Sequence, residues 1–378
     1  GKTFDCVSPI DGKVLTQVAE GAQEDVDRAV AAARAAFEDG RWARQAPARR
    51  KKVLLRWADL LEQHASELAL LETLDMGKPI GDSSRIDIPA VVGCIRWNAE
   101  AVDKVYDELA PVGDDAVSML VREPMGVVAA VVPWNFPLLM AAWKMGPALA
   151  TGNSMVIKPA EQSPLTVIRA AELAVEAGLP EGVLNVVPGF GETAGQALGR
   201  HMDVDAVAFT GSGEVGKLFL KYSGESNMKR VSLECGGKTP NIIMADAPDL
   251  DAAATAAAWG IFFNQGEVCN AGSRLLVEDR VKDQVVEKVM QVAKTLRVGD
   301  PLDPATQMGA MVDDTQMERV LGFIEKGQSE GASMKMGGKR ILAESGGYYI
   351  EPTVFDGVKN DMTIAREEIF APVLSTIT

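Results

Sequence analysis

Strand-like and helix-like segments alternate regularly between residues 127 and 244, and this alternation constrains the fold more than any other feature. Short apolar runs, such as 127–132 and 206–210, have the length of buried strands. Longer Ala- and Leu-rich segments lie between such runs, as at 138–150 and 164–177. Strands that alternate with helices through mostly short loops form a parallel sheet with helices on both faces. The sequence therefore predicts an α/β fold with a doubly wound, Rossmann-like sheet.

A second alternation follows residue 245. Helix-like runs at 252–263 and 281–296 flank a strand-like run at 274–278, which predicts a second α/β domain. Between the N-terminal helices and the first alternation, the turn-rich segment 107–124 predicts a protruding β-hairpin arm. Edge strands of this kind commonly pair with another subunit.

The charge balance excludes several classes of partner. The chain has 38 basic and 53 acidic residues, a net charge of −15, which disfavours nucleic acid and anionic membranes. Four scattered cysteines and two histidines predict neither a disulfide framework nor a metal site, and they suit the reducing cytoplasm. The apolar run 125–143 is interrupted by Pro133 and Pro137, so a buried strand and helix are favoured over a membrane span.

Cys269 lies in a short polar stretch between two apolar elements, among Gly, Asn and Ser residues. This setting indicates a thiol that is presented to a ligand. A thiolate is a strong nucleophile, and nearby backbone N–H groups can lower its pKa. The alternative is that Cys269 is a small buried hydrophobic residue, the commonest fate of a free cysteine.

The run from Thr210 to Gly216 contains three glycines, follows a strand and opens a helix. This pattern is typical of a dinucleotide-binding turn, in which the helix N-terminus holds phosphate; tight strand–helix packing is the alternative. Glu234 stands at the distance where such a turn places a ribose-binding acid. Glu234 also ends an apolar strand, and such a carboxylate suits a general base. A salt bridge with Lys238 is a third interpretation.

Two further strand ends carry polar side chains. Asn135 lies between two prolines, which favours a rigidly held amide that could stabilise an oxyanion; it could instead cap the helix that follows. Lys158 and Glu161 follow the next strand and could bond ribose hydroxyls, or they could form a surface ion pair.

Taken together, these stretches resemble the aldehyde dehydrogenase superfamily in order and spacing. The resemblance covers nearly the whole chain, is closest to bacterial enzymes that act on ω-amino or γ-glutamylamino aldehydes, and implies that the family's C-terminal segment is missing. The motifs are Trp134–Asn135, KPAEQSP at 158–164, FTGSGEVG at 209–216, LECGGK at 233–238, GEVCNAGSR at 266–274 and REEIFAPV at 366–373.

The resemblance implies a reaction. Cys269 attacks the aldehyde carbon to form a thiohemiacetal, and Asn135 with the backbone N–H of Cys269 holds the oxyanion. Hydride transfer to NAD leaves a thioester, which is hydrolysed by water that Glu234 activates. On this account Glu234 is the base and not a ribose ligand.

The resemblance also implies the cofactor contacts. Lys158 and Glu161 bind the adenosine ribose, and Glu161 would repel a 2′-phosphate, which favours NAD over NADP. Ser212 contacts the pyrophosphate, Glu367 contacts the nicotinamide ribose, and Trp134 and Phe370 line the nicotinamide side. The full predicted set is Trp134, Lys158, Glu161, Gly191, Gly211, Ser212, Gly216, Glu367 and Phe370.

The substrate and the assembly follow from the same resemblance. Asp87 aligns with the substrate-channel helix and could hold a cationic amino group, although a solvated surface position explains it equally well. The predicted organisation is an NAD-binding domain at 1–106 and 125–236, an oligomerisation arm at 107–124 of a homodimer or homotetramer, and a catalytic domain at 237–378. A CoA-acylating enzyme and an inactive NAD-binding or structural relative are the alternatives.

Overall fold

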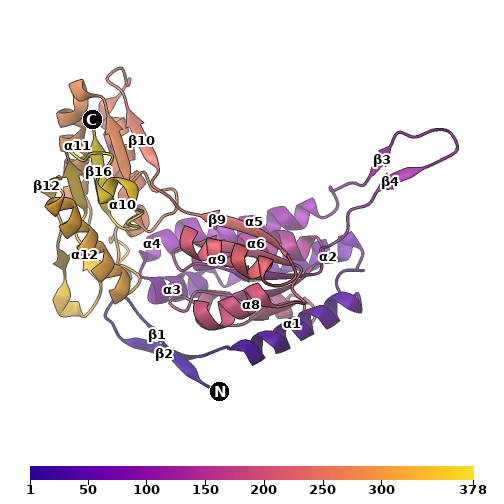
Figure 1. Ribbon diagram of the computed structural model, residues 1–378. Coiled ribbons are helices and arrows are strands. Elements are labelled where there is room, and N and C mark those ends of the chain that lie inside the picture. Colours follow the sequence, from indigo (N-terminus) through magenta and orange to yellow (C-terminus); the bar gives the residue numbers. More distant parts are fainter. The chain divides into compact units, whose positions relative to one another are not determined.

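The computed structural model describes residues 1–378, and the chain divides into two compact units (Figure 1). The first unit comprises residues 1–4, 18–69 and 86–234, and the second comprises 5–17, 70–85 and 235–378. The sequence places 5–17 and 70–85 with the first domain. They group with the second unit through long-range bonds, such as those from the N–H groups of Ala310 and Ile80 to the carbonyls of Gly77 and Pro301.

The first unit is built on a five-stranded sheet of order β7-β6-β5-β8-β9. The pairs β7–β6, β6–β5 and β5–β8 are parallel, as predicted. Every residue of β5 is buried, because β5 is the central strand and helices cover both of its faces. The bounds are β5 Val127–Val131, β6 Ser154–Lys158, β7 Leu184–Val186, β8 Ala206–Gly211 and β9 Arg230–Cys235.

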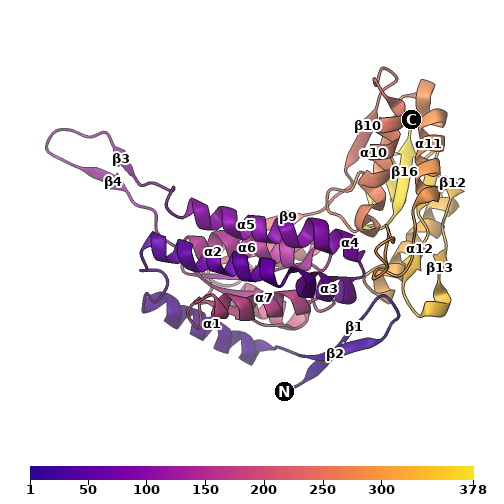
Figure 2. The ribbon, with the colours of Figure 1, turned by 180° about the vertical axis from the view of Figure 1, so that it is seen from behind.

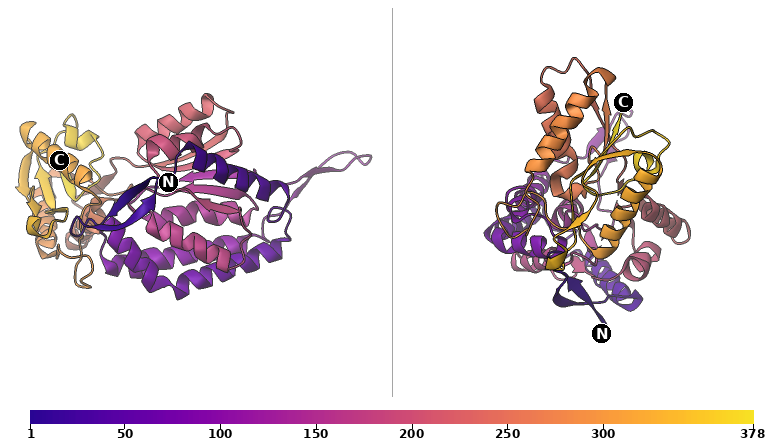
Figure 3. Two further views of the ribbon diagram at one scale, coloured as in Figure 1. Left: turned by 90° about the horizontal axis from the view of Figure 1, so that it is seen from below. Right: turned by 90° about the vertical axis from the view of Figure 1, so that its left-hand side faces the viewer.

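Helices cover both faces of this sheet. The face formed by Val127, Ala129 and Val131 packs against α1, α8 and α9. The other face carries α2, α5, α6 and α7, seen together in Figure 2 and edge-on in the left view of Figure 3. The bounds are α1 Gln23–Glu38, α2 Pro47–Gln63, α5 Ile88–Ala101, α6 Pro137–Ala150, α7 Leu165–Glu176, α8 Gln196–Arg200 and α9 Gly213–Gly224.

The segment from Pro47 to Met76, which Gly77 and Pro79 follow, forms two helices in the structure. α2 ends at Gln63, and α3 (Ala65–Met76) begins after His64, which has a non-helical backbone. The short helix α4 (Ile80–Asp82) and the π-helical turn η1 (Ser83–Asp87) then lead into α5. No Pro or Gly stands between Gln63 and Ala65, so the sequence pattern alone does not locate the break.

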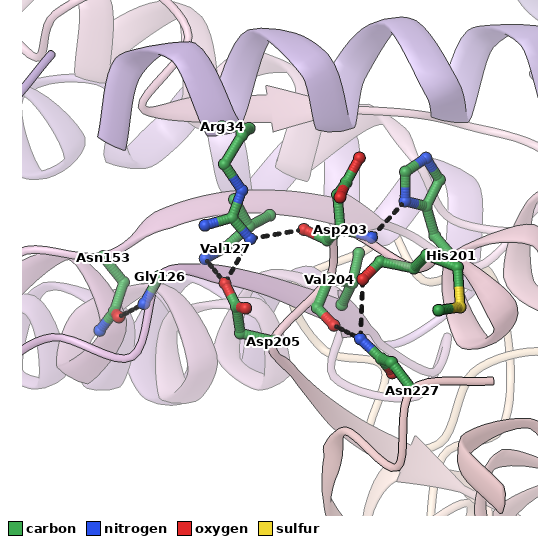
Figure 4. Close-up of polar contacts among 10 residues, drawn as sticks. Arg34, Gly126, Val127, Asn153, His201, Asp203, Val204, Asp205 and Asn227 are labelled. Atoms are coloured by element: carbon green, nitrogen blue, oxygen red, sulfur yellow. Dashed lines mark hydrogen bonds and ion pairs between the residues drawn. The ribbon is translucent and has the colours of Figure 1, made fainter. Parts of the chain in front are cut away.

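Polar groups close the edge of the first sheet where β5 begins and β8 is entered (Figure 4). Oδ2 of Asp205 accepts hydrogen bonds from the N–H of Val127 at 2.7 Å and from Nη2 of Arg34 on α1 at 2.6 Å. Oδ1 of Asn153 accepts one from the N–H of Gly126 at 3.0 Å. Asn227 donates to the carbonyls of Met202 and Val204. These groups satisfy one another, so this edge is a structural end of the sheet.

The predicted hairpin arm is present in the first unit. Strands β3 (Glu108–Ala110) and β4 (Ser118–Leu120) pair antiparallel and extend as a two-stranded ribbon (Figure 1). The ribbon carries large apolar side chains that are more than half exposed: Leu109, Val117, Met119, Leu120 and Val121.

The second unit contains another five-stranded sheet, of order β10-β11-β16-β15-β12. All its pairs are parallel except β12–β15, which is antiparallel. β10, which the sequence pattern counts with the first alternation, pairs with β11 here. The apolar run at the end of the chain is the central strand β16, fully buried. The bounds are β10 Pro240–Ile243, β11 Arg274–Val277, β12 Ser333–Met336, β15 Thr353–Asp356 and β16 Val373–Ile377.

Successive residues of β15 and β16 enter different cores, so this sheet also has helices on both faces. Val354 and Leu374 pack with α10 and α11, whereas Phe355 and Val373 pack with α12 (Figure 3, right). No helix in the structure combines the length and the apolar character needed to cross a membrane. The remaining bounds are β1 Thr3–Val7, β2 Val14–Ala19, α10 Leu250–Phe262, α11 Lys282–Thr295, α12 Asp314–Ser329, β13 Arg340–Ile341, β14 Tyr349–Ile350 and α13 Thr363–Arg366.

Candidate active site

Several predicted site residues lie at one edge of the first sheet. Because β5, β6 and β8 run parallel, the residues that follow them emerge at the same carboxyl edge, where α/β sheets bind ligands. This edge is opposite the structural edge closed by Asp205. The predicted residues that follow these three strands are Trp134, Asn135, Glu161 and Ser212, and Lys158 and Gly211 are the last residues of β6 and β8.

Lys158 is buried, so the alternative of a surface ion pair is wrong for its side chain. Its ammonium donates to the carbonyls of Pro159 and Gly189, each at 2.7 Å, and lies 3.2 Å from Oε2 of Glu161. Burial lowers the pKa of Lys158, and the charge of Glu161 opposes that shift. The Glu161 carboxylate is partly exposed and stands beside this cation. The pair thus presents a held cation and an acceptor, which match the hydroxyls of a ribose.

The glycine-rich turn forms the N-terminus of α9. Ser212 is the N-cap, and its Oγ accepts from the N–H of Val215 at 3.3 Å. A Cβ on Gly211 would lie 2.5 Å from the ring of Phe209, so only glycine fits there. A Cβ on Gly213 would meet nothing within 4 Å, so the space beside the helix terminus is open. A helix N-terminus with open space before it fits a pyrophosphate. The residues of the first unit therefore fit a dinucleotide.

The other two predicted glycines have different positions. Gly216 is buried within α9 and packs the helix onto its unit. Gly191 begins the π-helical turn η2 (Gly191–Gly195) that precedes α8, and a Cβ there would also meet open space.

Asn135 is 4% exposed in the loop between β5 and α6. The residue that caps α6 is Phe136, so the prediction that Asn135 could be the cap is wrong. Oγ of Ser163 donates to the carbonyl of Trp134 at 3.4 Å, which ties this loop to the segment after β6. A buried amide in a tied loop has the rigidity that an oxyanion donor requires.

Glu234 is exposed near the end of β9, not in the apolar setting that its strand predicted. β9 is the edge strand of its sheet, which explains the exposure. The charge of Glu234 acts on Lys144 of α6 in the same unit. Burial lowers the pKa of Lys144, and the charge of Glu234 raises it. Lys144 was not predicted, although it is the single charged residue in the apolar segment 137–150, a pattern that suggests a specific role.

Cys269 is exposed in the second unit, so the alternative of a small buried residue is wrong. The loop before it has an unusual backbone: Asn264, Gln265 and Gly266 have φ values of 49°, 56° and 71°. A Cβ on Gly266 would lie 2.2 Å from the carbonyl oxygen of Ala371. Consecutive left-handed residues are costly and persist only where the surroundings enforce them, which occurs most often at functional sites.

The segment that contains Glu367 and Phe370 lies in the same unit. Glu367 is exposed, whereas Glu368 is half-buried and accepts a hydrogen bond from the N–H of Gly237 at 3.1 Å. Burial raises the pKa of Glu368. Phe370 has a left-handed φ of 60°. Of these two neighbouring carboxyl groups, only that of Glu368 is held by a backbone hydrogen bond, although the sequence pattern had pointed to Glu367.

Two residues of α12 hold this segment, and sequence reasoning missed both. Nε2 of Gln316 donates to the carbonyls of Ile369 at 3.2 Å and Phe370 at 2.8 Å. Nη2 of Arg319 donates to the carbonyl of Glu368 at 2.9 Å. Their side chains bond to a segment that lies 49 to 54 residues later in the sequence, so no local pattern identifies them as residues that hold the site.

Asp87 is completely buried, and the alternative of a solvated surface position is wrong. It is the last residue of η1 and the N-cap position of α5. A buried carboxylate at this point is available to interior groups rather than to bulk solvent.

Comparison with known proteins identifies the family. Residues 1–378 match the aldehyde dehydrogenase family. The chain is 54% identical over 373 residues to the NADP/NAD-dependent aldehyde dehydrogenase PuuC of Escherichia coli, covering 99% of this chain and 74% of that protein.

Two solved structures extend the comparison. An indole-3-acetaldehyde dehydrogenase in complex with NAD+ has a TM-score of 0.99 at 60% identity. A gamma-glutamyl-gamma-aminobutyraldehyde dehydrogenase from Burkholderia cenocepacia has a TM-score of 0.97 at 59% identity. Each comparison covers 100% of this chain and 76% of the solved chain. The chain therefore belongs to the aldehyde dehydrogenase family, as its motifs predicted, and is an NAD(P)-dependent oxidoreductase that acts on the aldehyde group.

Proposed function

We propose that Cys269 is the nucleophile in the oxidation of an aldehyde to its carboxylic acid. The thiolate adds to the carbonyl carbon, and the amide of Asn135 with the N–H of Cys269 donates to the oxyanion. NAD, when bound, accepts the hydride. Glu234 takes a proton from the water that attacks the resulting thioester, and Cys269 leaves as the thiolate. The observation that carries this proposal is the exposed Cys269 at the end of an enforced left-handed loop.

The first unit supplies most of the proposed cofactor contacts. Lys158 and Glu161 bind the adenosine ribose, and the N-terminus of α9 at Ser212 holds the pyrophosphate. Gly191 leaves room for the approach, whereas Gly211 and Gly216 allow the close packing of the turn and of α9. Glu161 disfavours a 2′-phosphate, so NAD is preferred over NADP. Trp134 and Phe370 line the nicotinamide side. For the nicotinamide ribose, we propose Glu368 in place of Glu367, because Glu368 is held by Gly237 and its segment by α12.

The proposed substrate is an ω-amino or γ-glutamylamino aldehyde. The similar Burkholderia enzyme is described as acting on such a compound. Asp87, buried at the start of α5, is the carboxyl group that we propose pairs with the cationic amino group of the substrate. The indole-3-acetaldehyde enzyme is equally similar to this chain, so an apolar aldehyde is the competing substrate.

NADH absorbance with purified protein and NAD tests this proposal. The substrates are 4-aminobutanal, butanal, which lacks only the amino group, and indole-3-acetaldehyde. A higher kcat/KM for 4-aminobutanal, reduced toward that of butanal in Asp87→Asn, supports the amino-aldehyde assignment. A preference for indole-3-acetaldehyde that Asp87→Asn leaves unchanged would overturn it. Acyl-CoA formation on adding CoA would overturn hydrolysis by Glu234.

The assembly is a further part of the proposal. We propose a cytoplasmic homodimer or homotetramer in which the hairpin arm at 107–124 contributes to the interface, because its exposed apolar side chains lack an intramolecular partner surface. Light scattering after size exclusion should give a dimer or tetramer. The double substitution Leu109→Lys and Met119→Lys should lower the mass, and an unchanged mass would remove the arm from the interface.

A further inference from the structure

Glu267 is a completely buried carboxyl group two residues before Cys269, and the reaction above does not use it. Its Oε1 accepts a hydrogen bond from the backbone N–H of Val312 at 3.1 Å. Burying a carboxyl group away from water is costly unless hydrogen bonds or an opposite charge compensate for the lost hydration. Its position beside the proposed nucleophile therefore requires an explanation.

The loop before Glu267 is held to the same neighbouring segment, residues 309–312. Oε1 of Gln265 accepts from the N–H of Gly309 at 3.1 Å, and its Nε2 donates to the carbonyl of Ala310 at 3.2 Å. Nδ2 of Asn264 donates to the carbonyl of Glu267 at 3.3 Å. Gln265 and Glu267 thus make three bonds to one short segment from opposite sides of Gly266.

The 309–312 segment is itself fixed, so it can serve as a support. The N–H of Ala310 donates to the carbonyl of Gly77 at 3.1 Å, and that of Met311 to the carbonyl of Tyr348 at 2.7 Å. Asp313, the next residue, caps α12 by accepting from the N–H of Gln316 at 2.7 Å. The loop is therefore fastened to a rigid part of its unit.

Burial and the charge of Asp313 favour the neutral form of Glu267, against three groups that favour its charged form. Burial is the main cause that raises the pKa of Glu267 well above its ordinary value, and the charge of Asp313 adds to it. The hydrogen bond from Val312, the charge of Lys78 and Gln265 oppose this shift. Lys78 is itself buried, with its Nζ 3.5 Å from Oε1 of the equally buried Glu72. A neutral carboxyl group still accepts the Val312 hydrogen bond.

We propose that Glu267 is a positioning residue for Cys269: its carboxyl group anchors the peptide that presents the thiol to the support formed by residues 309–312. This inference rests on the proposed role of Cys269 as nucleophile. Because Gln265 and Glu267 bracket the left-handed Gly266, the loss of one anchor frees the loop to relax toward ordinary backbone angles. A small displacement of a nucleophile greatly reduces its reactivity.

Two substitutions and a control test the proposal. Glu267→Gln keeps a neutral acceptor for Val312, and Glu267→Ala removes it. Glu287→Gln, an exposed position on α11, is the matched control. The measurements are the rate of Cys269 alkylation by iodoacetamide in the folded protein, kcat for aldehyde oxidation, and the Kd of NAD.

The proposal expects Glu267→Ala to lower both alkylation and kcat by about 10- to 100-fold, with the Kd of NAD unchanged. Glu267→Gln and the control should stay within about threefold of the original protein, because they retain the anchor. Wild-type rates in Glu267→Ala would overturn the proposal. Equal losses in the Gln and Ala variants would also overturn it, since they would assign the effect to the charge or the proton.

A third variant keeps the test decisive if Glu267→Ala does not fold. Glu267→Asp retains the carboxyl group but shortens its reach, so the variant should fold. Its alkylation rate should fall to a value between those of Glu267→Gln and Glu267→Ala. An unchanged rate in Glu267→Asp would contradict anchoring. Retained activity in Cys269→Ala would instead overturn the nucleophile assignment, so the two failures can be distinguished.

Discussion

Two glutamates of this protein, Glu234 and Glu267, have opposite environments. Glu234 is exposed near the end of the edge strand β9, where water can reach its carboxylate. Glu267 is completely buried and accepts a hydrogen bond from a backbone N–H group. Water can therefore reach one carboxyl group and not the other. Burial, not residue type, distinguishes the proposed base from the proposed anchor.

The comparison extends to the backbone around each residue. Glu234 belongs to a regular strand, so its position depends on ordinary sheet pairing. Glu267 follows three left-handed residues, of which two are not glycine. A strand end tolerates substitution of its side chain, whereas an enforced loop depends on each bond that holds it.

The largest expected effect is the loss of kcat in Cys269→Ala. The losses of rate in the Glu234 and Glu267 variants can be compared with it. Removal of the nucleophile should lower kcat by about 10⁴-fold or more, as for other enzymes that use covalent catalysis. NADH formation with a saturating aldehyde measures it. NAD binding should be unchanged, because Cys269 is not among the proposed cofactor contacts. Substantial remaining turnover would assign the nucleophile elsewhere.

Glu234→Gln sharpens the contrast with Glu267→Gln. Loss of the general base should slow hydrolysis by about 10²- to 10⁴-fold, while the first NADH is still formed. Rapid-quench measurement should therefore show one equivalent of NADH and an accumulated acyl-enzyme. Normal steady-state turnover would exclude Glu234 as the base.

Asp205→Ala probes a carboxylate with a purely structural setting, at the opposite edge of the first sheet. The substitution leaves the N–H of Val127 and the guanidinium of Arg34 without their acceptor. The free energy of unfolding should fall by about 1–3 kcal/mol, measured by urea denaturation. Specific activity of the folded protein should be unchanged, and a loss of activity without a loss of stability would contradict the structural role.

The pH dependence of stability gives the smallest effect. The pKa of Glu267 is raised in the folded state, so the folded protein holds a proton that the unfolded chain releases above its ordinary pKa of about 4.3. Stability from this group is present below that pH and falls as the pH rises toward the folded value. Glu267→Gln should therefore gain stability relative to the original protein as the pH rises, in parallel urea titrations. A pH-independent difference would contradict a raised pKa.

Local patterns predicted the elements with strong periodicity. The strands of the first sheet, the helices on its faces and the hairpin arm follow from apolar runs and turn residues, and the motifs identified the family. The break at His64 was not predicted, and the strand alternation grouped β10 with the first sheet although the predicted boundary at 237 places it in the second domain. Both depend on packing beyond the local segment. Gln316 and Arg319 were missed for the same reason.

The sequence by itself determined the α/β class and the family, because periodicity, turn residues and motif order are properties of the chain. The tertiary structure decided which glutamate is buried, which of Glu367 and Glu368 is held, and that Asp87 lies inside. Burial and hydrogen-bond partners come from segments distant in sequence. Glu267 and Glu234 are indistinguishable as letters, and only the surrounding packing makes one an anchor and the other a candidate base.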